Sequence, residues 1–581
     1  MIHKLYGSKL ADFAAALSVV LLCLILYLYR HDLLFRDDGY KTLNIIAINF
    51  CLIRSLASAE AFPMLMVMAP SELDFDLLLS VVVVVVSCLV VVRSFRPGRK
   101  DGGLVLPPSP PTLPIIGNLH QLSRSHTHRR LQELAQRHGS LFLLRLGSVP
   151  TLVVSSASMA EEVLKTQDHV FCSRPLQHTA RGLLYGCRDV AFSPYGERWR
   201  KLRLIAVLRL LNAKRVDSFR ALREEEVASF LERIRAASAH EDGGGKRRGV
   251  NLNELFVSLA YTVISKAAFG SKLGGMEPTA VHALMEETSD LLETIAVTDM
   301  FPRLRWVDWA TGLDARIKRT ASKLDAVLEG ALREHENSGN HDGDADDDDF
   351  LGDLLSAVKE GDVGVELDRT GVKGLILDLF LAGIDTTSKI MEWTMAELVK
   401  NPKEKEKVQA EVRQIVGGHG SVTEEQLGTM TRLQAATKEA LRLHPPVPLL
   451  APREVIHDTK LHGYNIPAKT RVLINAWAIG RDNESWENAD AFWPDRFVHG
   501  AIDYSGNKDF RFIPFGAGRR GCPGVGFAMR LVELVLANML YHFDWELPDD
   551  QVLESFEVAE TSGFTIGLRN ALVLVAKPLQ A

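Results

Sequence analysis

One cysteine lies in a segment whose residue types could do chemistry. Residues 514–524 read PFGAGRRGCPG, and this segment contains four glycines, two arginines and Cys522. Glycines let a backbone turn tightly and approach a flat ligand closely. Cys522 directly precedes Pro523, a residue type favoured at the first position of a helix. A cysteine beside cations at a helix N-terminus has a lowered pKa, so we expect Cys522 to be available as a thiolate. The alternative, a buried cysteine beside a glycine turn, does not explain why these residue types occur together.

A second unusual segment lies inside a long amphipathic stretch. Residues 382–387 read AGIDTT, so small residues are followed by Asp385 and then by Thr386 and Thr387. Small residues make room on one face of a helix, and a threonine hydroxyl can bond to the carbonyl four residues earlier and bend the helix. The alternative is a solvent-exposed Asp-Thr-Thr step.

Two further pairs of residues have the spacing of neighbours on one face of a helix. Glu439 and Arg442 have the i, i+3 spacing of a helical ion pair, which is a weak signal on its own. Trp199 and Arg203 have the i, i+4 spacing that places both on one face of a helix. An arginine suits a buried carboxylate because its guanidinium donates two parallel hydrogen bonds. Arg453, which follows Pro452, is a further arginine of this kind.

The Cys522 segment resembles the haem-binding signature F-x-x-G-x-R-x-C-x-G of the cytochrome P-450 monooxygenases. The residues from Phe515 to Gly524 match it at every defined position. The resemblance implies that Cys522 is the axial thiolate ligand of the iron in haem b, whose electron donation favours cleavage of the O–O bond. It also implies that Arg520 binds a haem propionate and that Phe515 shields the sulfur atom.

The other segments resemble further motifs of the same family. AGIDTT is similar to (A/G)-G-x-(D/E)-T-(T/S), which implies that Asp385 and Thr386 relay protons to dioxygen. Trp199 and Arg203 resemble a W-x-x-x-R helix and, with Arg453, are the remaining candidates for binding haem. The segments EALR and FWPDRF resemble the motifs E-x-x-R and P-E-R-F, with an aspartate in place of the commoner glutamate. They imply a structural lock near the haem, formed by residues Glu439, Arg442 and Arg496.

The elements that must position these residues are mainly helical. The chain has 581 residues, a net charge of −6 and 46% hydrophobic residues, which is the composition of a large globular protein. Residues 141–155 are predicted to form two strands around a Gly-Ser turn, residues 158–166 a helix, and residues 241–249 and 341–349 polar loops. The resemblance implies a mainly α cytochrome P-450 fold with small β-sheets over residues 115–580, preceded by an N-terminal transmembrane anchor. The predicted helices cover residues 197–211, 216–238, 251–270, 278–295, 313–335, 370–400 and 402–415, and the apolar run 525–540 after Cys522.

The apolar run at residues 77–92 is the predicted anchor. Acidic residues precede it and basic residues follow it, so the rule that positive flanks stay cytosolic places the rest of the chain in the cytosol. Residues 93–114 form a basic, proline-rich hinge. A second apolar run at 13–29 lies in an extension, residues 1–63, that either adds a membrane span or precedes a functional start near Met64. The proline hinge and the forms AGIDTT, EALRLHPP and PFGAGRRGCPG most resemble the plant A-type microsomal group of the cytochrome P-450 family. This resemblance implies a single-pass protein of the endoplasmic reticulum membrane.

The resemblance implies an enzyme that inserts one atom of O₂ into a small lipophilic molecule in specialised metabolism. Electrons are expected from NADPH through a separate NADPH–cytochrome P-450 reductase, because the sequence contains no flavin domain or dinucleotide fingerprint. Membrane lipid is an expected partner, and the acidic net charge gives no reason to expect nucleic acid. The alternatives are a thiolate-haem isomerase or dehydratase and a non-catalytic membrane scaffold.

The resemblance also implies where a substrate and the reductase would bind. The loops expected to set specificity are residues 173–195, 447–451 and 561–564. The basic residues expected to dock the reductase are Arg200, Lys201, Lys438 and Arg519.

Overall fold

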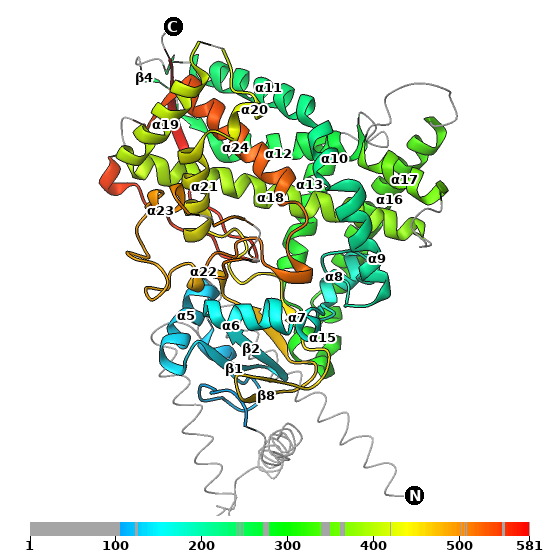
Figure 1. The fold of residues 1–581 in the computed structure, drawn as a ribbon. Helices are drawn as coiled ribbons and strands as arrows, with labels where there is room; N and C mark the ends of the chain where they lie inside the picture. Colours follow the sequence, from blue (N-terminus) through cyan, green and yellow to red (C-terminus); the bar gives the residue numbers. More distant parts are fainter. Residues whose placement is uncertain are drawn as a thin grey trace, which may run out of the picture. The chain divides into compact units, whose positions relative to one another are not determined.

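A computed structural model describes most of the chain after residue 104 (Figure 1). The described residues are 105–122, 126–239, 241–242, 246–247, 249–270, 278–338, 349–360, 367–418, 420–500, 502–504, 506, 508–548 and 552–579. The predictions for residues 1–63, with the apolar run at 13–29, for the anchor at 77–92 and for the first part of the hinge lie outside these residues and stay predictions.

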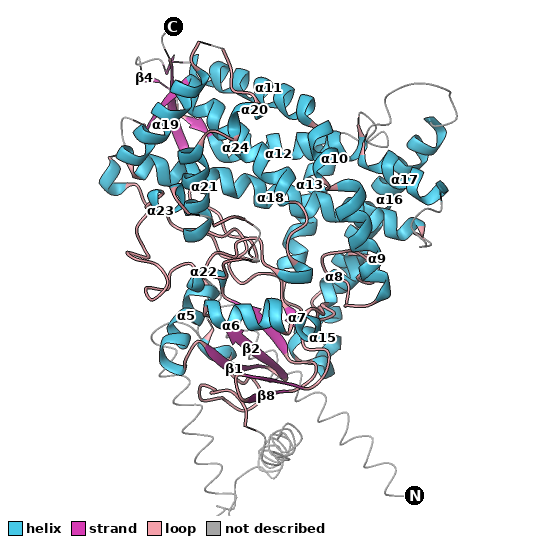
Figure 2. Ribbon diagram, in the orientation of Figure 1, coloured by secondary structure: helices cyan, strands magenta, loops and turns pink. Residues whose placement is uncertain are grey.

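The described body is mainly helical, and a long helix runs through its middle (Figures 1 and 2). This helix, α18 (Arg369–Lys400), begins where the side chain of Asp368 accepts a hydrogen bond from the backbone N–H of Gly371 at 2.9 Å. Such a cap satisfies one of the N–H groups that the first turn of a helix leaves unpaired. Helices α12 (Leu252–Phe269), α21 (Thr431–Leu443) and α24 (Val525–His542) pack against α18 and bury most of it.

Further helices surround this group. The other long helices are α5 (Thr127–His138), α9 (Glu197–Ile205), α11 (Arg220–Ala239), α13 (Pro278–Glu293), α16 (Leu313–Ser338), α17 (Phe350–Glu360) and α19 (Pro402–Val416). The short α-helices are α6 (Ala157–Glu161), α7 (Asp168–Phe171), α8 (His178–Leu183), α10 (Ala213–Ser218), α14 (Val297–Met300), α15 (Arg305–Ala310), α20 (Glu424–Leu427), α22 (Ala476–Ile479) and α23 (Asp495–Val498). The 3-10 turns are Leu119–Gln121, Pro302–Leu304, Gly518–Arg520 and Leu553–Ser555, and the π-helical segments are Glu162–Thr166 and Ala206–Leu210.

The strands form small sheets, as expected for this fold. The largest has four strands in the order β1 (Leu141–Leu146), β2 (Val149–Val154), β9 (Arg471–Ile474) and β6 (Arg453–Glu454). In it β1 and β2 are antiparallel with Leu144 opposite Thr151, and β2 and β9 are parallel. A second sheet has the order β10 (Phe543–Glu546), β11 (Val573–Pro578) and β5 (Val250–Asn251). The described residues also contain two strand pairs: β3 (Glu241–Asp242) with β4 (Lys246–Arg247), and β7 (Thr459–Leu461) with β8 (Tyr464–Ile466).

Within the described residues most predicted elements are present, and four differ. The helix predicted at 216–238 is divided at Phe219 between α10 and α11. The polar loop predicted at 341–349 lies outside the described residues except for Asp349 and stays a prediction. The predicted helix at 197–211 is α-helical only to Ile205 and ends in the π-helical segment Ala206–Leu210, and the helix predicted at 158–166 likewise ends in Glu162–Thr166. Hydrophobic periodicity cannot distinguish one wider turn from an α-helical turn. The polar stretch 241–249 contains the short β3–β4 pair where a loop was predicted.

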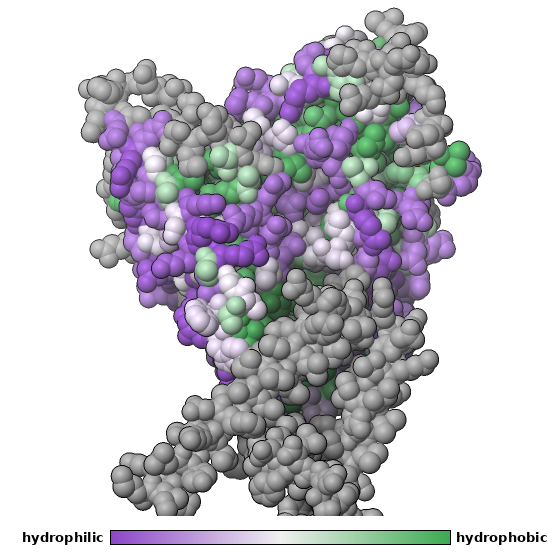
Figure 3. Space-filling view, turned by 180° about the vertical axis from the view of Figure 1, so that it is seen from behind, coloured by the Kyte–Doolittle hydropathy of each residue, from purple (hydrophilic) through white to green (hydrophobic). Residues whose placement is uncertain are grey.

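Helix α24 is the only described helix that is long and apolar enough to cross a membrane, but 67% of it is buried inside the protein. Such burial is expected of a core helix. The face of the molecule in Figure 3 is mostly hydrophilic, with small apolar patches between the polar residues.

The predicted lock around Glu439 forms deep in the protein. Both side chains of the Glu439–Arg442 pair are inaccessible to solvent, and the guanidinium of Arg442 donates to both carboxylate oxygens at 2.7 and 2.8 Å. Arg496 donates to Glu439 Oε1 at 3.0 Å. Arg442 also donates to the backbone carbonyls of Ala489 and Ala491, at 2.6 and 3.0 Å. The lock therefore joins α21 to the irregular segment that precedes α23.

Replacement of Glu439 by glutamine should destabilise the protein strongly. The substitution leaves the buried guanidinium of Arg442 without a counter-charge, a change that costs about 3–5 kcal/mol in comparable pairs. We expect a clearly lower midpoint of thermal unfolding. The control is Glu133→Gln on α5, which breaks an exposed pair with Arg130 at the same i, i+3 spacing and should change the midpoint little. Equal effects of the two substitutions would contradict a special role for the buried lock.

Candidate active site

The backbone around Cys522 is a tight loop that ends at α24. The N–H of Cys522 donates to the carbonyl of Phe515 at 2.9 Å, and the N–H of Gly521 donates to that of Gly518 at 3.0 Å. Gly518 has a φ of +69°, and a Cβ added there would lie 2.1 Å from the carbonyl oxygen of Leu164. No other residue fits that position without a clash. Glycine at 518 is therefore a requirement of the loop's path.

The sulfur of Cys522 faces open space although protein surrounds it. The side chain is exposed, and the thiol lines a cavity of about 430 Å³. The backbone N–H groups of Gly524 and Val525 donate to the sulfur, because α24 begins at Val525. The sequence indicated that Pro523 occupies the first position of the helix. In the structure Pro523 instead precedes the helix, which begins at Val525.

The predicted direction of the pKa change is wrong. Burial raises the pKa of the Cys522 thiol, and the N–H groups of Gly524 and Val525 and the guanidinium of Arg203 only partly oppose that rise. Burial among protein atoms removes water from the thiolate and disfavours its charge. A sequence motif does not show how deeply a residue is buried. A metal ion bound to the sulfur would reverse the balance, since a coordinating thiol is deprotonated outright.

The other residues that were predicted to bind the haem lie around this loop or within it. Arg203 donates to the carbonyl of Gly521 at 2.6 Å and lines the cavity. The guanidinium of Arg520 lies 3.9 Å from the centre of the Trp199 ring, and both side chains donate to the carbonyl of Val190 at 3.1 Å. Arg453 donates to the carbonyl of Ala517 within the loop at 2.9 Å.

One residue that the sequence did not single out holds the loop in place. The buried carboxylate of Asp168 accepts hydrogen bonds from the Arg453 guanidinium at 2.8 Å, from the backbone N–H of Arg519 at 2.9 Å and from the Arg519 guanidinium at 3.1 Å. Asp168 is far from the loop in sequence and belongs to no motif, so only the fold brings it there.

The residues present suit a flat iron cofactor. The lining of the cavity combines the soft sulfur ligand of Cys522 with the cation of Arg203, the aromatic ring of Phe515 and glycines without side chains. A soft sulfur ligand suits iron, cations suit propionates, and bare backbone allows a planar ring to approach. The donor set therefore fits haem.

Asp385 and Thr386 lie in the middle of α18, and the residues lining that cavity include neither. The Thr386 hydroxyl donates to the carbonyl of Ala382 at 2.5 Å, and Ala382 is exposed within an otherwise largely buried helix. Asp385 Oδ2 accepts a hydrogen bond of 2.5 Å from the hydroxyl of Thr565. The structure thus joins Asp385 to the residue that follows the turn at 561–564, which was predicted to set substrate specificity.

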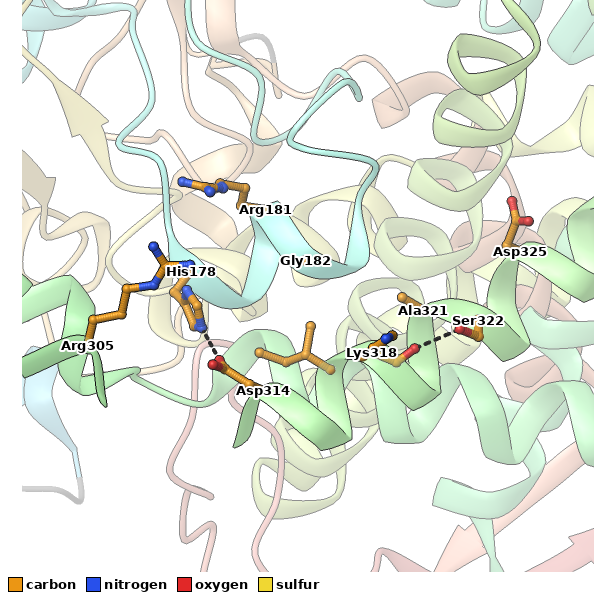
Figure 4. Close-up of a pocket in the computed structure, with 10 residues that line it drawn as sticks. His178, Arg181, Gly182, Arg305, Asp314, Lys318, Ala321, Ser322 and Asp325 are labelled. Carbon is orange, nitrogen blue, oxygen red and sulfur yellow. Dashed lines mark hydrogen bonds and ion pairs between the residues drawn. The ribbon is translucent and has the colours of Figure 1, made fainter. Parts of the chain in front are cut away.

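A larger cavity, of about 530 Å³, is lined mainly by α8, α15 and α16 (Figure 4). His178 Nε2 lies 2.6 Å from Asp314 Oδ1 on its wall, within hydrogen-bond distance, and Arg181 and Arg305 add positive charge. The residues that line it include no cysteine and none of the residues predicted to bind haem. We therefore assign the active site to the cavity at Cys522 rather than to the larger one.

Comparison with known proteins decides the family. Residues 107–572 match the family model described as Cytochrome P450. The chain belongs to the cytochrome P450 family. It is 49% identical over 465 residues to Cytochrome P450 71A1 of Persea americana, which covers 79% of this chain and 91% of that protein. It is 42% identical over 488 residues to phenylacetaldehyde oxime monooxygenase CYP71AN24 of Prunus mume, with 84% and 91% covered.

The solved structures agree with this assignment. A zebrafish cytochrome P450 with abiraterone superposes with a TM-score of 0.64 and 26% sequence identity, covering 78% of this chain and 99% of that one. The protein therefore has the cytochrome P450 fold and haem as its cofactor, and it is a cytochrome P450 monooxygenase of a plant family. The individual roles of its site residues remain predictions.

Replacement of Cys522 by serine should abolish the shifted absorption band that carbon monoxide gives with reduced haem when a thiolate ligates the iron. Serine removes the soft thiolate donor and hardly changes the side chain's size. The measurement is the reduced carbon-monoxide difference spectrum at equal protein concentration. Cys187→Ser is the control, because Cys187 is buried away from the cavity lining and its replacement should keep the band. Retention of the band in Cys522→Ser would remove Cys522 from this role.

Proposed function

We propose that this cytochrome P450 inserts one atom of O₂ into a small lipophilic molecule of specialised plant metabolism, with electrons from NADPH through a separate reductase. The observation that carries the proposal is the sulfur of Cys522 facing a cavity lined by Arg203 and Phe515. The oxime monooxygenase and the other plant relatives support specialised metabolism as the setting. NADPH-dependent product formation from a plant metabolite extract, with reductase added, tests it.

In this proposal Cys522 ligates the haem iron, and Arg203, Trp199, Arg520 and Arg453 hold the propionate side of the ring directly or through the loop. Phe515 shields the sulfur. When bound, the haem supplies activation of dioxygen, helped by electron donation from the thiolate. The N–H groups of Gly524 and Val525 moderate the charge on that sulfur, as hydrogen bonds around a metal ligand do.

Asp385 and Thr386 hold and deliver protons in this account. The Thr386 hydroxyl back-bonds to the Ala382 carbonyl, at the one exposed position of this stretch of α18. A hydroxyl at an opening in a buried helix can hold a water molecule and direct a proton, which is general-acid catalysis through a relay. The intact acid–threonine pair also speaks against the isomerase alternative, whose usual mark is a disrupted pair.

Replacement of Thr386 by alanine should uncouple NADPH consumption from product formation. Alanine deletes the hydroxyl and keeps a good helix former, so haem incorporation should be normal. The ratio of product to NADPH should fall about tenfold or more, and hydrogen peroxide should rise. An unchanged ratio would reduce Thr386 to a structural helix residue and reopen the isomerase alternative.

For the membrane we propose that residues 77–92 anchor the protein in the endoplasmic reticulum with the catalytic domain in the cytosol. A chain that starts at Met64 should then keep both microsomal association and monooxygenase activity, because it retains this run. Membrane fractionation of the shortened and full chains measures the association. Loss of association in the shortened chain would assign the anchor to residues 13–29.

For the reductase we propose the basic surface next to the Cys522 loop. Arg200 is exposed there, and Arg519 is half-exposed beside Asp168. Lys438 is a weaker candidate than the sequence indicated, because its ammonium is part-buried and donates to the carbonyl of Ile502 at 2.9 Å. Lys201 is half-buried and pairs with the exposed Glu197 at the i, i+4 spacing and a distance of 3.0 Å.

A further inference from the structure

A single hydroxyl group lies between two carboxyl groups beside the predicted proton-delivery pair. Thr565 Oγ1 is 2.5 Å from Asp385 Oδ2 and 3.1 Å from Glu293 Oε1. The backbone N–H of Thr565 also donates to Glu293 Oε1 at 3.2 Å. Asp385 comes from α18, Glu293 is the last residue of α13, and Thr565 follows the turn at 561–564. Three segments far apart in sequence therefore meet at one hydroxyl.

One hydroxyl hydrogen cannot make a full hydrogen bond to each of two ionised carboxylates. A threonine hydroxyl carries one hydrogen, and an ionised carboxylate carries none. The hydroxyl therefore has one hydrogen for two carboxyl groups, and its shorter contact is the one with Asp385. A proton on one of the two carboxyl groups lets both contacts be full hydrogen bonds at the same time.

The surroundings favour a proton on Glu293. Burial raises the pKa of the Glu293 carboxyl, and the charge of Asp385 raises it further, against the opposing hydrogen bonds from Thr565 and from the Phe564 backbone. Glu293 is also the last residue of α13, and the negative end of a helix dipole disfavours negative charge. Asp385 has the Lys389 ammonium 4.0 Å from its Oδ1.

The turn also closes over Glu293. A Cβ added at Gly563 would lie 2.6 Å from Glu293 Oε2, so a larger residue there would have to displace the carboxyl. Glu293 is nevertheless only partly buried, which leaves it a route to solvent protons.

We propose that Glu293 holds a proton at neutral pH and passes it through the Thr565 hydroxyl to Asp385, as a positioning residue for proton delivery. The O–H bond of Glu293 breaks as one forms at Thr565 Oγ1, and the hydrogen that Thr565 carried moves to Asp385 Oδ2. Glu293 becomes a carboxylate, Asp385 becomes a neutral acid, no electrons are exchanged, and solvent restores the proton on Glu293. The inference rests on the proposed function of Asp385 and Thr386.

The first test is infrared spectroscopy of the haem-loaded full chain at pH 7. The difference spectrum between the wild type and Glu293→Gln should show loss of a protonated-carboxyl band. The control is Glu287→Gln on the same helix, where the Thr320 hydroxyl and nearby cations lower the pKa of Glu287. That substitution should remove a carboxylate band instead. A protonated-carboxyl band that is absent from the wild type, or unchanged in Glu293→Gln, would overturn the proposal.

The second test is the pH dependence of stability. A carboxyl group whose pKa is raised in the folded protein contributes most stability below its unfolded pKa and loses that contribution as the pH rises through its folded value. The thermal midpoint of the wild type should therefore fall relative to that of Glu293→Gln as the pH increases above the ordinary range for glutamate. A constant difference across that range would contradict the raised affinity for the proton.

The third test is coupling, the ratio of product to NADPH. Thr565→Val removes the hydroxyl at nearly constant volume and should lower the ratio severalfold, as should Glu293→Gln, whereas Thr565→Ser should restore it. Failure of the proposed function is recognised separately, since the wild type would then lack the shifted carbon-monoxide band or Thr386→Ala would leave the ratio unchanged. Presence of that band with unchanged coupling in both variants would overturn the relay alone.

Discussion

The site depends on a sulfur atom that is enclosed by protein and yet faces a cavity. Enclosure raises the pKa of the Cys522 thiol, and two backbone N–H groups and Arg203 compensate for only part of that effect. A cation that coordinates the sulfur would supply the missing stabilisation. The constraint explains the neighbouring residue types, because glycines make room for a flat ligand and arginines provide charge for its carboxylates.

Buried ion pairs, rather than large sheets, hold the segments around this sulfur. Asp168 fixes the loop through Arg453 and Arg519, and Glu439 fixes α21 to the segment before α23 through Arg442 and Arg496. Each of these carboxylates accepts several hydrogen bonds, which is the condition under which burial of charge is tolerated. Irregular backbone near the cavity is thereby kept in one geometry.

Local patterns predicted a good part of this structure. The spacing from Phe515 to Gly524 identified the cysteine, and the helix and strand patterns identified α12, α18 and the β1–β2 hairpin. Asp168, Glu293 and Thr565 were not predicted, because each acts across a sequence distance that no single motif spans. The direction of the Cys522 pKa change was missed for a related reason. Burial depends on the tertiary fold, whereas the helix terminus and the nearby cations can be read from the sequence.

The most direct test of the central claim is X-ray absorption at the iron edge of the purified, haem-loaded full chain and of its Cys522→Ser variant. The account predicts one sulfur neighbour of iron in the wild type and only nitrogen or oxygen neighbours in the variant. A sulfur neighbour that persists in Cys522→Ser, or that is missing from the wild type, would contradict the assignment of Cys522 as the ligand around which the site is built.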